Sequence, residues 1–142
     1  MSSVPESPAI TQAAASSVPV SNKMLWTGRV ISALPILLML LSAALKLAKP
    51  APVVQGFARA GYPESLLLSL GILEILCCVV YMIPRTSILG AILMTGYLGG
   101  ATATNVRIGD PSFPLPVLLG VFVWGGLYLR DVRLRALLPL RR

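Results

Sequence analysis

The chain has 142 residues, of which 56% are hydrophobic and 12% charged, and its mean hydropathy is +0.81. This composition is typical of membrane proteins and excludes an ordinary soluble domain. The net charge is +7, but the basic residues lie at the ends of apolar stretches, where they orient a membrane protein, so we expect no nucleic-acid partner. The chain has no histidine, the commonest ligand of metals and haem, so we expect no metal site and no cofactor held by this chain alone.

Residues 1–22 are rich in Ser, Ala, Pro and Val and show no hydrophobic periodicity, which predicts a disordered cytoplasmic tail. The first basic residue is Lys23, so this segment lacks the positive start of a signal peptide. The first apolar span follows at about 30–47 and is preceded by Trp26 and Arg29, an aromatic and a basic anchor of the interfacial kind.

A short helix is expected at 53–60, between the first two spans. Pro52 suits the first turn of this helix, and Gly61 suits the position just after its end. Pro63 then restarts the chain. The short helix should rest on the bundle or in the headgroup layer.

The second span, 66–83, contains a carboxylate in its middle, that of Glu74. Eighteen residues at ~1.5 Å each span roughly 27 Å, close to the ~30 Å hydrocarbon core of a bilayer. Placing a charge at the centre of a membrane helix costs roughly 2.5 to 3.5 kcal/mol. We therefore expect Glu74 to face protein or a water-filled cavity and to have a partner.

The third span, about 87–103, follows a turn so short that it forces the second and third spans to be antiparallel neighbours. Thr86 is the candidate N-cap of the third span. Gly96 and Gly100 are four residues apart, a spacing that lets membrane helices approach closely, and we interpret it as a packing feature.

A polar loop at 104–114 separates the third span from the fourth, which covers about 115–129. The loop carries Asn105, Arg107 and Asp110. After the fourth span comes a basic cytoplasmic tail, 131–142, whose arginines and interleaved leucines favour the anionic face of a membrane. The membrane domain is therefore expected at 23–130.

The distribution of basic residues outside the spans predicts the orientation. Eight lie on the side of the termini: Lys23, Arg29, Arg85, Arg130, Arg133, Arg135, Arg141 and Arg142. Three lie on the other side: Lys49, Arg59 and Arg107. This bias places both termini in the cytoplasm. We expect an all-α, antiparallel four-helix transmembrane bundle with one short extracytoplasmic helix, in the inner membrane of a bacterium.

Lys46 and Glu74 are expected to converge, because side chains lean toward the N-terminus of their own helix and the two spans run in opposite directions. Their depths differ by roughly 9 Å along the membrane normal, which is near their combined reach. Both a direct pair and a single bridging water remain open.

Several polar residues should gather in the same half of the membrane, and we take five of them as a candidate binding pocket: Lys46, Glu74, Asn105, Arg107 and Asp110. Thr102 lies at the same level. The alternative is that Lys46 extends outward to water and Glu74 is satisfied as part of the structural packing.

One face of the second span carries Glu74, Cys77, Cys78 and Tyr81, at intervals of three, four and seven residues from the first. Adjacent cysteines fit neither a disulfide framework nor a CxxC redox pair. Burial makes a thiol inert, so a redox role is disfavoured. Tyr81 is expected near the inner interface.

Five short motifs resemble the DoxX-like family of small bacterial four-helix membrane proteins: SAALKL at 42–47, GFARAGYP at 56–63, GILE at 71–74, IPR at 83–85 and GDPSF at 109–113. The resemblance covers about 26–129, and its matching positions are Lys46, Gly61, Tyr62, Pro63, Glu74, Pro84 and Arg85. The family takes its name from a subunit associated with a terminal quinol oxidase. The resemblance thus implies a membrane-embedded subunit connected to quinone or thiosulfate redox chemistry, although a chain without histidine is not the haem-bearing subunit.

Two classes of function follow. The leading hypothesis is a non-enzymatic membrane protein, either an accessory subunit of a redox assembly or a binder of a small amphipathic molecule such as a quinone or a lipid. The lipid bilayer, partner membrane subunits or a second copy of the chain are the expected partners. The alternative is an enzyme in which Glu74 is a general acid or base and Lys46 or Arg107 holds an anionic group.

Overall fold

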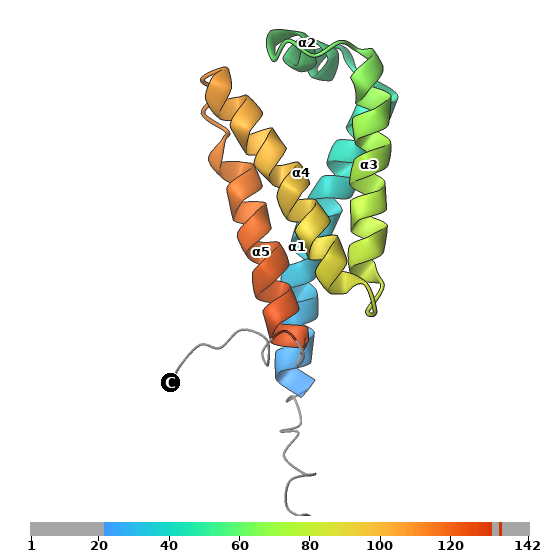
Figure 1. Cartoon of the computed structure of the whole chain (residues 1–142), viewed down its shortest axis with the longest axis vertical. Helices are drawn as coiled ribbons and strands as arrows, with labels where there is room; N and C mark the ends of the chain where they lie inside the picture. Colours follow the sequence, from blue (N-terminus) through green and yellow to red (C-terminus); the bar gives the residue numbers. More distant parts are fainter. Residues whose placement is uncertain (1–21, 132–133, 135–142) are drawn as a thin grey trace, which may run out of the picture.

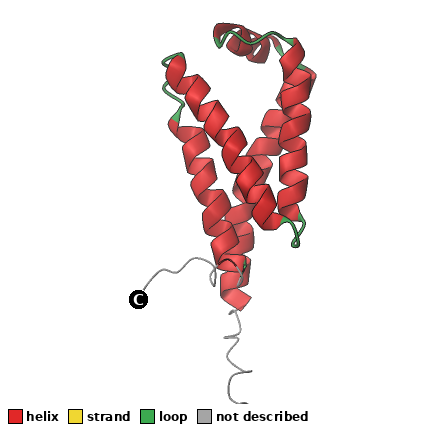
Figure 2. Ribbon diagram, in the orientation of Figure 1, coloured by secondary structure: helices red, strands yellow, loops and turns green. Residues whose placement is uncertain are grey.

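The computed structural model describes residues 22–131 and residue 134. The two expected tails therefore lie outside the described residues, apart from Asn22, Asp131 and Leu134. The described part of the chain is all-α (Figure 2). Its helices are α1 (Asn22–Ala48), α2 (Ala51–Arg59), α3 (Ser65–Met82), α4 (Ser87–Arg107) and α5 (Pro114–Arg130).

Four of these helices form an antiparallel bundle, and α2 lies across one end of it (Figure 1). In this bundle α1 packs against α3 and α5, and α4 packs against the same two helices, so the four close into a ring. One end, which we call the terminal end, holds the start of α1, the end of α5 and the α3–α4 turn. The opposite end, the α2 end, holds α2 and the α4–α5 loop.

The helices α1, α3 and α4 are each long and apolar enough to cross a membrane. The fourth helix of the ring, α5, is also apolar and has 17 residues, which extend about 26 Å. Large apolar side chains on the outside of the ring are exposed, including Leu37 at 64% and Val121 at 62%. An apolar exterior around a helical ring suits hydrocarbon, and the predicted helical membrane bundle is confirmed.

Glycines bring the helices close together at the terminal end. A Cβ added at Gly126 of α5 would lie 2.3 Å from the Ser32 hydroxyl oxygen of α1, and one added at Gly90 of α4 would lie 2.3 Å from the Tyr81 Cα of α3. No side chain fits at such distances, so only glycine permits this packing. From there α3 and α4 diverge toward the α2 end (Figure 1).

The Gly96 and Gly100 pair does not bring two helices of this chain together, contrary to the packing expected from its spacing. A Cβ added at either position would meet no atom within 4 Å among the described residues. Both glycines line a pocket. The close contact of α4 with α3 is made instead by Gly90, one turn after the α3–α4 turn.

Tyr81, in the last turn of α3, is fully buried in the core. Its hydroxyl donates to the Val123 carbonyl oxygen at 2.8 Å and lies 3.1 Å from the Ser32 hydroxyl. The Arg130 guanidinium lies 4.6 Å from the centre of its ring. These contacts join α3 to α1 and α5 and reinforce the glycine-mediated packing of the terminal end.

The ends of α2 and α4 are formed by two glycines with positive φ, Gly61 at 76° and Gly109 at 69°. After α2, the Tyr62 N–H donates to the Phe57 carbonyl at 2.9 Å, and the two rings lie 6.0 Å apart between centres. This is a Schellman motif with its usual hydrophobic contact, and it confirms the expected role of Gly61. The short helix predicted at 53–60 is thus present, and it begins two residues and ends one residue earlier than expected.

Thr86 occupies the N-cap position of α4, as expected, but its side chain does not cap the helix. Its hydroxyl donates to the Val80 carbonyl oxygen in the last turn of α3 at 2.8 Å. The residue therefore ties the turn back to α3, which holds the two helices together where Gly90 brings them into contact.

Candidate functional site

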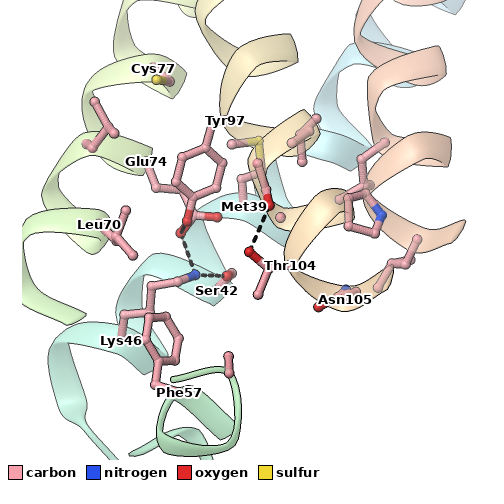
Figure 3. Close-up of a pocket in the computed structure, with 18 of the residues that line it drawn as sticks. Met39, Ser42, Lys46, Phe57, Leu70, Glu74, Cys77, Tyr97, Thr104 and Asn105 are labelled. Atoms are coloured by element: carbon pink, nitrogen blue, oxygen red, sulfur yellow. Dashed lines mark hydrogen bonds and ion pairs between the residues drawn. The ribbon is translucent and has the colours of Figure 1, made fainter. Parts of the chain in front are cut away.

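A pocket of about 1020 Å³ lies toward the α2 end of the ring, between the diverging helices (Figure 3). Each of the five helices contributes to its wall. Most of the wall is apolar, and Phe57 of α2 lies at the α2 end of the pocket. The divergence of α3 and α4 is thus what creates the space, and α2 covers it.

Lys46 of α1 and Glu74 of α3 form a direct ion pair in the pocket wall, with 2.8 Å between Nζ and Oε2 (Figure 3). Their side chains are 12% and 3% exposed. The Lys46 ammonium also donates to the hydroxyl of Ser42, one turn earlier on α1. The two side chains therefore converge as their opposite helix directions predicted, and no bridging water is needed to join them.

Tyr97 of α4 completes this group, and the sequence analysis did not single it out. Its hydroxyl donates to Oε2 of Glu74 at 3.2 Å, and the Lys46 ammonium lies 5.9 Å from the centre of its ring. A signal for it exists in the sequence. Glu74 comes eleven residues before Arg85 in the α3–α4 turn and Tyr97 twelve after it, so an antiparallel hairpin places the two at the same depth.

Asn105 and Asp110 line the pocket at the α2 end, near the α4–α5 loop. Asp110 accepts hydrogen bonds from the backbone N–H of Ser112, at 2.8 Å, and from its hydroxyl. These two hydrogen bonds hold the pKa of the Asp110 carboxyl below its ordinary value. Asp110 is therefore a fixed negative charge at this end of the pocket at neutral pH.

Arg107, the fifth candidate, does not line the pocket. Its guanidinium donates to the Ala60 carbonyl oxygen and lies 5.9 Å from the centre of the Tyr62 ring. The Tyr62 hydroxyl lies 2.9 Å from that of Thr104. These contacts attach the segment after α2 to the end of α4, so Arg107 holds the cover of the pocket in place.

Thr102, which was expected at the same level, uses its hydroxyl within its own helix, where it donates to the Leu98 carbonyl oxygen at 2.8 Å.

The predicted face of α3 is confirmed, since Glu74, Cys77, Cys78 and Tyr81 are all buried. Both cysteines are free thiols, and only Cys77 lines the pocket.

The ring of apolar helices and the buried ion pair facing an apolar pocket define a small multi-pass membrane protein of the helical-bundle class. A model of the DoxX-like family matches residues 30–126, well over half of the chain, and the protein belongs to that family. The family resemblance seen in the five short motifs is thereby confirmed. No curated protein and no solved structure matches the chain significantly.

Proposed function

We propose that this protein is a non-enzymatic binder of a small amphipathic molecule, such as a quinone or a lipid, in the inner membrane of a bacterium. The observation that carries the proposal is the pocket itself. Its volume of about 1020 Å³ suits a ligand of drug size or somewhat larger, and binding pockets of that kind are mainly apolar with a few polar groups that fix orientation. Here Lys46, Glu74 and Tyr97 are those groups.

The route of entry proposed for the ligand is the space between α3 and α4. Several side chains that line the pocket are also among the exposed large apolar ones, including Leu73 of α3 and both Ile92 and Leu93 of α4. Pocket wall and lipid-facing surface are therefore continuous there. A molecule dissolved in the bilayer can reach the ion pair without crossing water, whereas the α2 end is covered by α2 and by the segment after it, which Arg107 holds through the Ala60 carbonyl oxygen.

Two neighbouring glycines of α4 offer a matched test of binding. Gly100 lines the pocket and Gly99 does not, yet a Cβ added at either position would meet no atom within 4 Å among the described residues. Gly100→Leu and Gly99→Leu make the same gain in helix propensity, of about 1 kcal/mol, but only the first places a side chain in the pocket.

The test is to purify wild type and both variants in mild detergent and to identify by mass spectrometry the small molecules that remain bound. The proposal expects an amphipathic ligand with wild type and Gly99→Leu and its loss, by tenfold or more, with Gly100→Leu. Equal retention by the two variants would show that the molecule is bound elsewhere, and no retained molecule with wild type would count against a binding function.

An accessory role in a membrane redox assembly is the form of this proposal that the family resemblance supports. It predicts that the same purification retains partner subunits, or a second copy of the chain, together with the small molecule. Mass measurement of the intact complex distinguishes these outcomes. A chain that is always isolated alone would favour the binder without the assembly.

The enzymatic alternative is supported by the position of Glu74 in the pocket wall, where a carboxylate can exchange a proton with a bound molecule. Arg107 lies outside the lining, so Lys46 is the basic residue left to hold an anionic substrate group. Glu74→Gln separates the two functions. Turnover of a retained molecule by wild type, abolished in this variant while binding persists, would favour the enzyme.

A further inference from the structure

The Glu74 carboxylate uses only one of its two oxygens. Lys46 and Tyr97 both donate to Oε2, and Oε1 accepts no hydrogen bond from the described residues. Every fully buried side-chain oxygen or nitrogen in the described part of the chain has a partner, so Oε1 is not sealed inside the protein. It is an unpartnered acceptor, on a side chain 3% exposed, that is reached from the pocket.

Donors with free capacity lie on the same pocket wall. The Lys46 ammonium has three N–H groups, of which two are used, toward Ser42 and Glu74. The side-chain amide of Asn105, which lines the pocket, makes no hydrogen bond with the described residues. A ligand group that donates to Oε1 and accepts from a neighbouring N–H matches this arrangement, and a hydroxyl does both through a single oxygen. A carbonyl group accepts only and would leave Oε1 unpartnered.

The charges of the lining select against ionised headgroups. Among the described residues that line the pocket, the charged ones are Lys46, Glu74 and Asp110. The first two neutralise each other and Asp110 adds a negative charge, so the lining residues leave no unpaired positive charge to hold an anionic headgroup. A cationic headgroup placed at Oε1 would lie close to the Lys46 ammonium, which is 2.8 Å from the other oxygen of the same carboxylate.

We infer that the pocket recognises an uncharged amphiphile with a hydroxyl headgroup, an alcohol or a phenol, whose O–H donates to Oε1 of Glu74. This inference rests on the proposed binding function and specifies its ligand class. The apolar remainder of the molecule lies along the pocket wall toward the opening between α3 and α4. Phospholipids and fatty-acid anions are thereby excluded as the preferred ligand.

The test compares four probes with alkyl chains of eleven or twelve carbons: dodecan-1-ol, its methyl ether, dodecanoate and dodecylamine. Each is titrated into the full-length protein in phosphatidylcholine nanodiscs, and bound probe is counted by native mass spectrometry. The Gly99→Leu and Gly100→Leu variants are titrated in parallel. Binding present in the first variant and lost in the second is specific to the pocket, which removes the contribution of partition into lipid.

The expected result is pocket-specific binding of the alcohol at least about tenfold tighter than that of the ether, because a hydrogen bond to a charged acceptor is lost. Dodecanoate and dodecylamine should also bind at least tenfold more weakly than the alcohol. Dodecylphenol in the same assay shows whether an aromatic carrier is preferred to an aliphatic one.

Glu74→Gln provides a second measurement. The amide oxygen should remain toward Lys46, because an amide N–H group cannot accept from an ammonium, so the amide nitrogen then faces the pocket. An ether can accept from it, and the ratio of alcohol to ether affinity should fall toward one. If this variant does not fold, the probe series with wild type still decides.

Equal affinities for the alcohol and the ether, or tighter binding of either ionised probe, would overturn the headgroup inference. If all four probes bind wild type with equal affinity and all lose that binding in Gly100→Leu, the pocket binds amphiphiles without selecting the headgroup, so the proposed function stands and the headgroup inference falls. Absence of pocket-specific binding by any probe also overturns the inference, while the molecule retained on purification decides the proposed function separately.

Discussion

Removing one partner of the Lys46 and Glu74 pair should destabilise the protein more than removing both. Two unit charges about 4 Å apart attract each other by about 4 kcal/mol at an effective dielectric constant of 20, and the Nζ and Oε2 atoms of this pair are 2.8 Å apart. Breaking a buried pair costs about 3 to 5 kcal/mol because the remaining charge is stranded. By contrast, ordinary hydrogen bonds between membrane helices contribute only about 0.6 kcal/mol on average.

The two single substitutions should differ, because the partners are unequally protected. Lys46→Met strands a carboxylate that is 3% exposed and keeps only Tyr97 as a donor, so we expect a loss of about 3 kcal/mol. Glu74→Leu leaves an ammonium that is 12% exposed, keeps Ser42 as an acceptor and can meet water in the pocket, so we expect a smaller loss, about 2 kcal/mol.

The double variant, with Lys46→Met and Glu74→Leu, should lie within about 1 kcal/mol of wild type, because apolar side chains of similar size replace the pair. The free energy of unfolding is measured by titration with a denaturing detergent in mixed micelles. The reasoning predicts a coupling energy of about 4 kcal/mol in this cycle. A coupling below about 1 kcal/mol, or a double variant no more stable than Lys46→Met, would refute the view that the pair is held in a low-dielectric site.

Three further predictions concern other parts of the fold. Gly90→Ala should lower the free energy of unfolding by about 1 to 3 kcal/mol, because the added Cβ would overlap the backbone of α3. Gly96→Ala, where the Cβ meets open space, should be neutral or stabilising. A similar loss in both variants would contradict the packing described. Because the pKa of Asp110 is lowered, its hydrogen bonds to Ser112 stabilise the loop fully above the ordinary pKa of 3.8, and this stabilisation is lost as the pH falls through the lower pKa of the folded state. Protection of the Ser112 amide from hydrogen exchange should therefore fall in acid. This acid dependence should disappear in Asp110→Asn. Reporter fusions at Arg85 and Asp110 should report opposite sides of the membrane, with Arg85 in the cytoplasm; both on one side would rule out the proposed orientation.

Sequence reasoning was most reliable where the signal is local or follows from helix direction. The four apolar stretches and the short helix before Gly61 follow from hydropathy and turn chemistry, and the structure has them. The contact between Lys46 and Glu74 followed from the opposite directions of two spans and the lean of their side chains. These arguments need no knowledge of how the bundle is packed.

Features that depend on which faces meet were missed. Gly96 and Gly100 have a spacing that favours helix packing, but α4 contacts α3 through Gly90, and the divergence that follows is a property of the whole ring. Arg107 is in the expected region, yet its guanidinium reaches the Ala60 carbonyl oxygen, which residue types do not indicate. The contact between Tyr97 and Glu74 could be predicted only by counting how far each residue lies from the α3–α4 turn.

The glycine-mediated packing of the terminal end has a consequence for the two leaflets of the bilayer. Because the helices meet at Gly28, Gly90 and Gly126, the cross-section of the protein is narrow in one leaflet, and it widens in the other, where the pocket lies. Under the proposed binding function, the ligand enters from the leaflet of the α2 end, where the pocket between α3 and α4 lies, and a molecule confined to the other leaflet would first have to cross the bilayer. If the termini lie in the cytoplasm, as the charge bias predicts, the leaflet of the α2 end is the outer one, and the proposed ligand is one that the outer leaflet supplies.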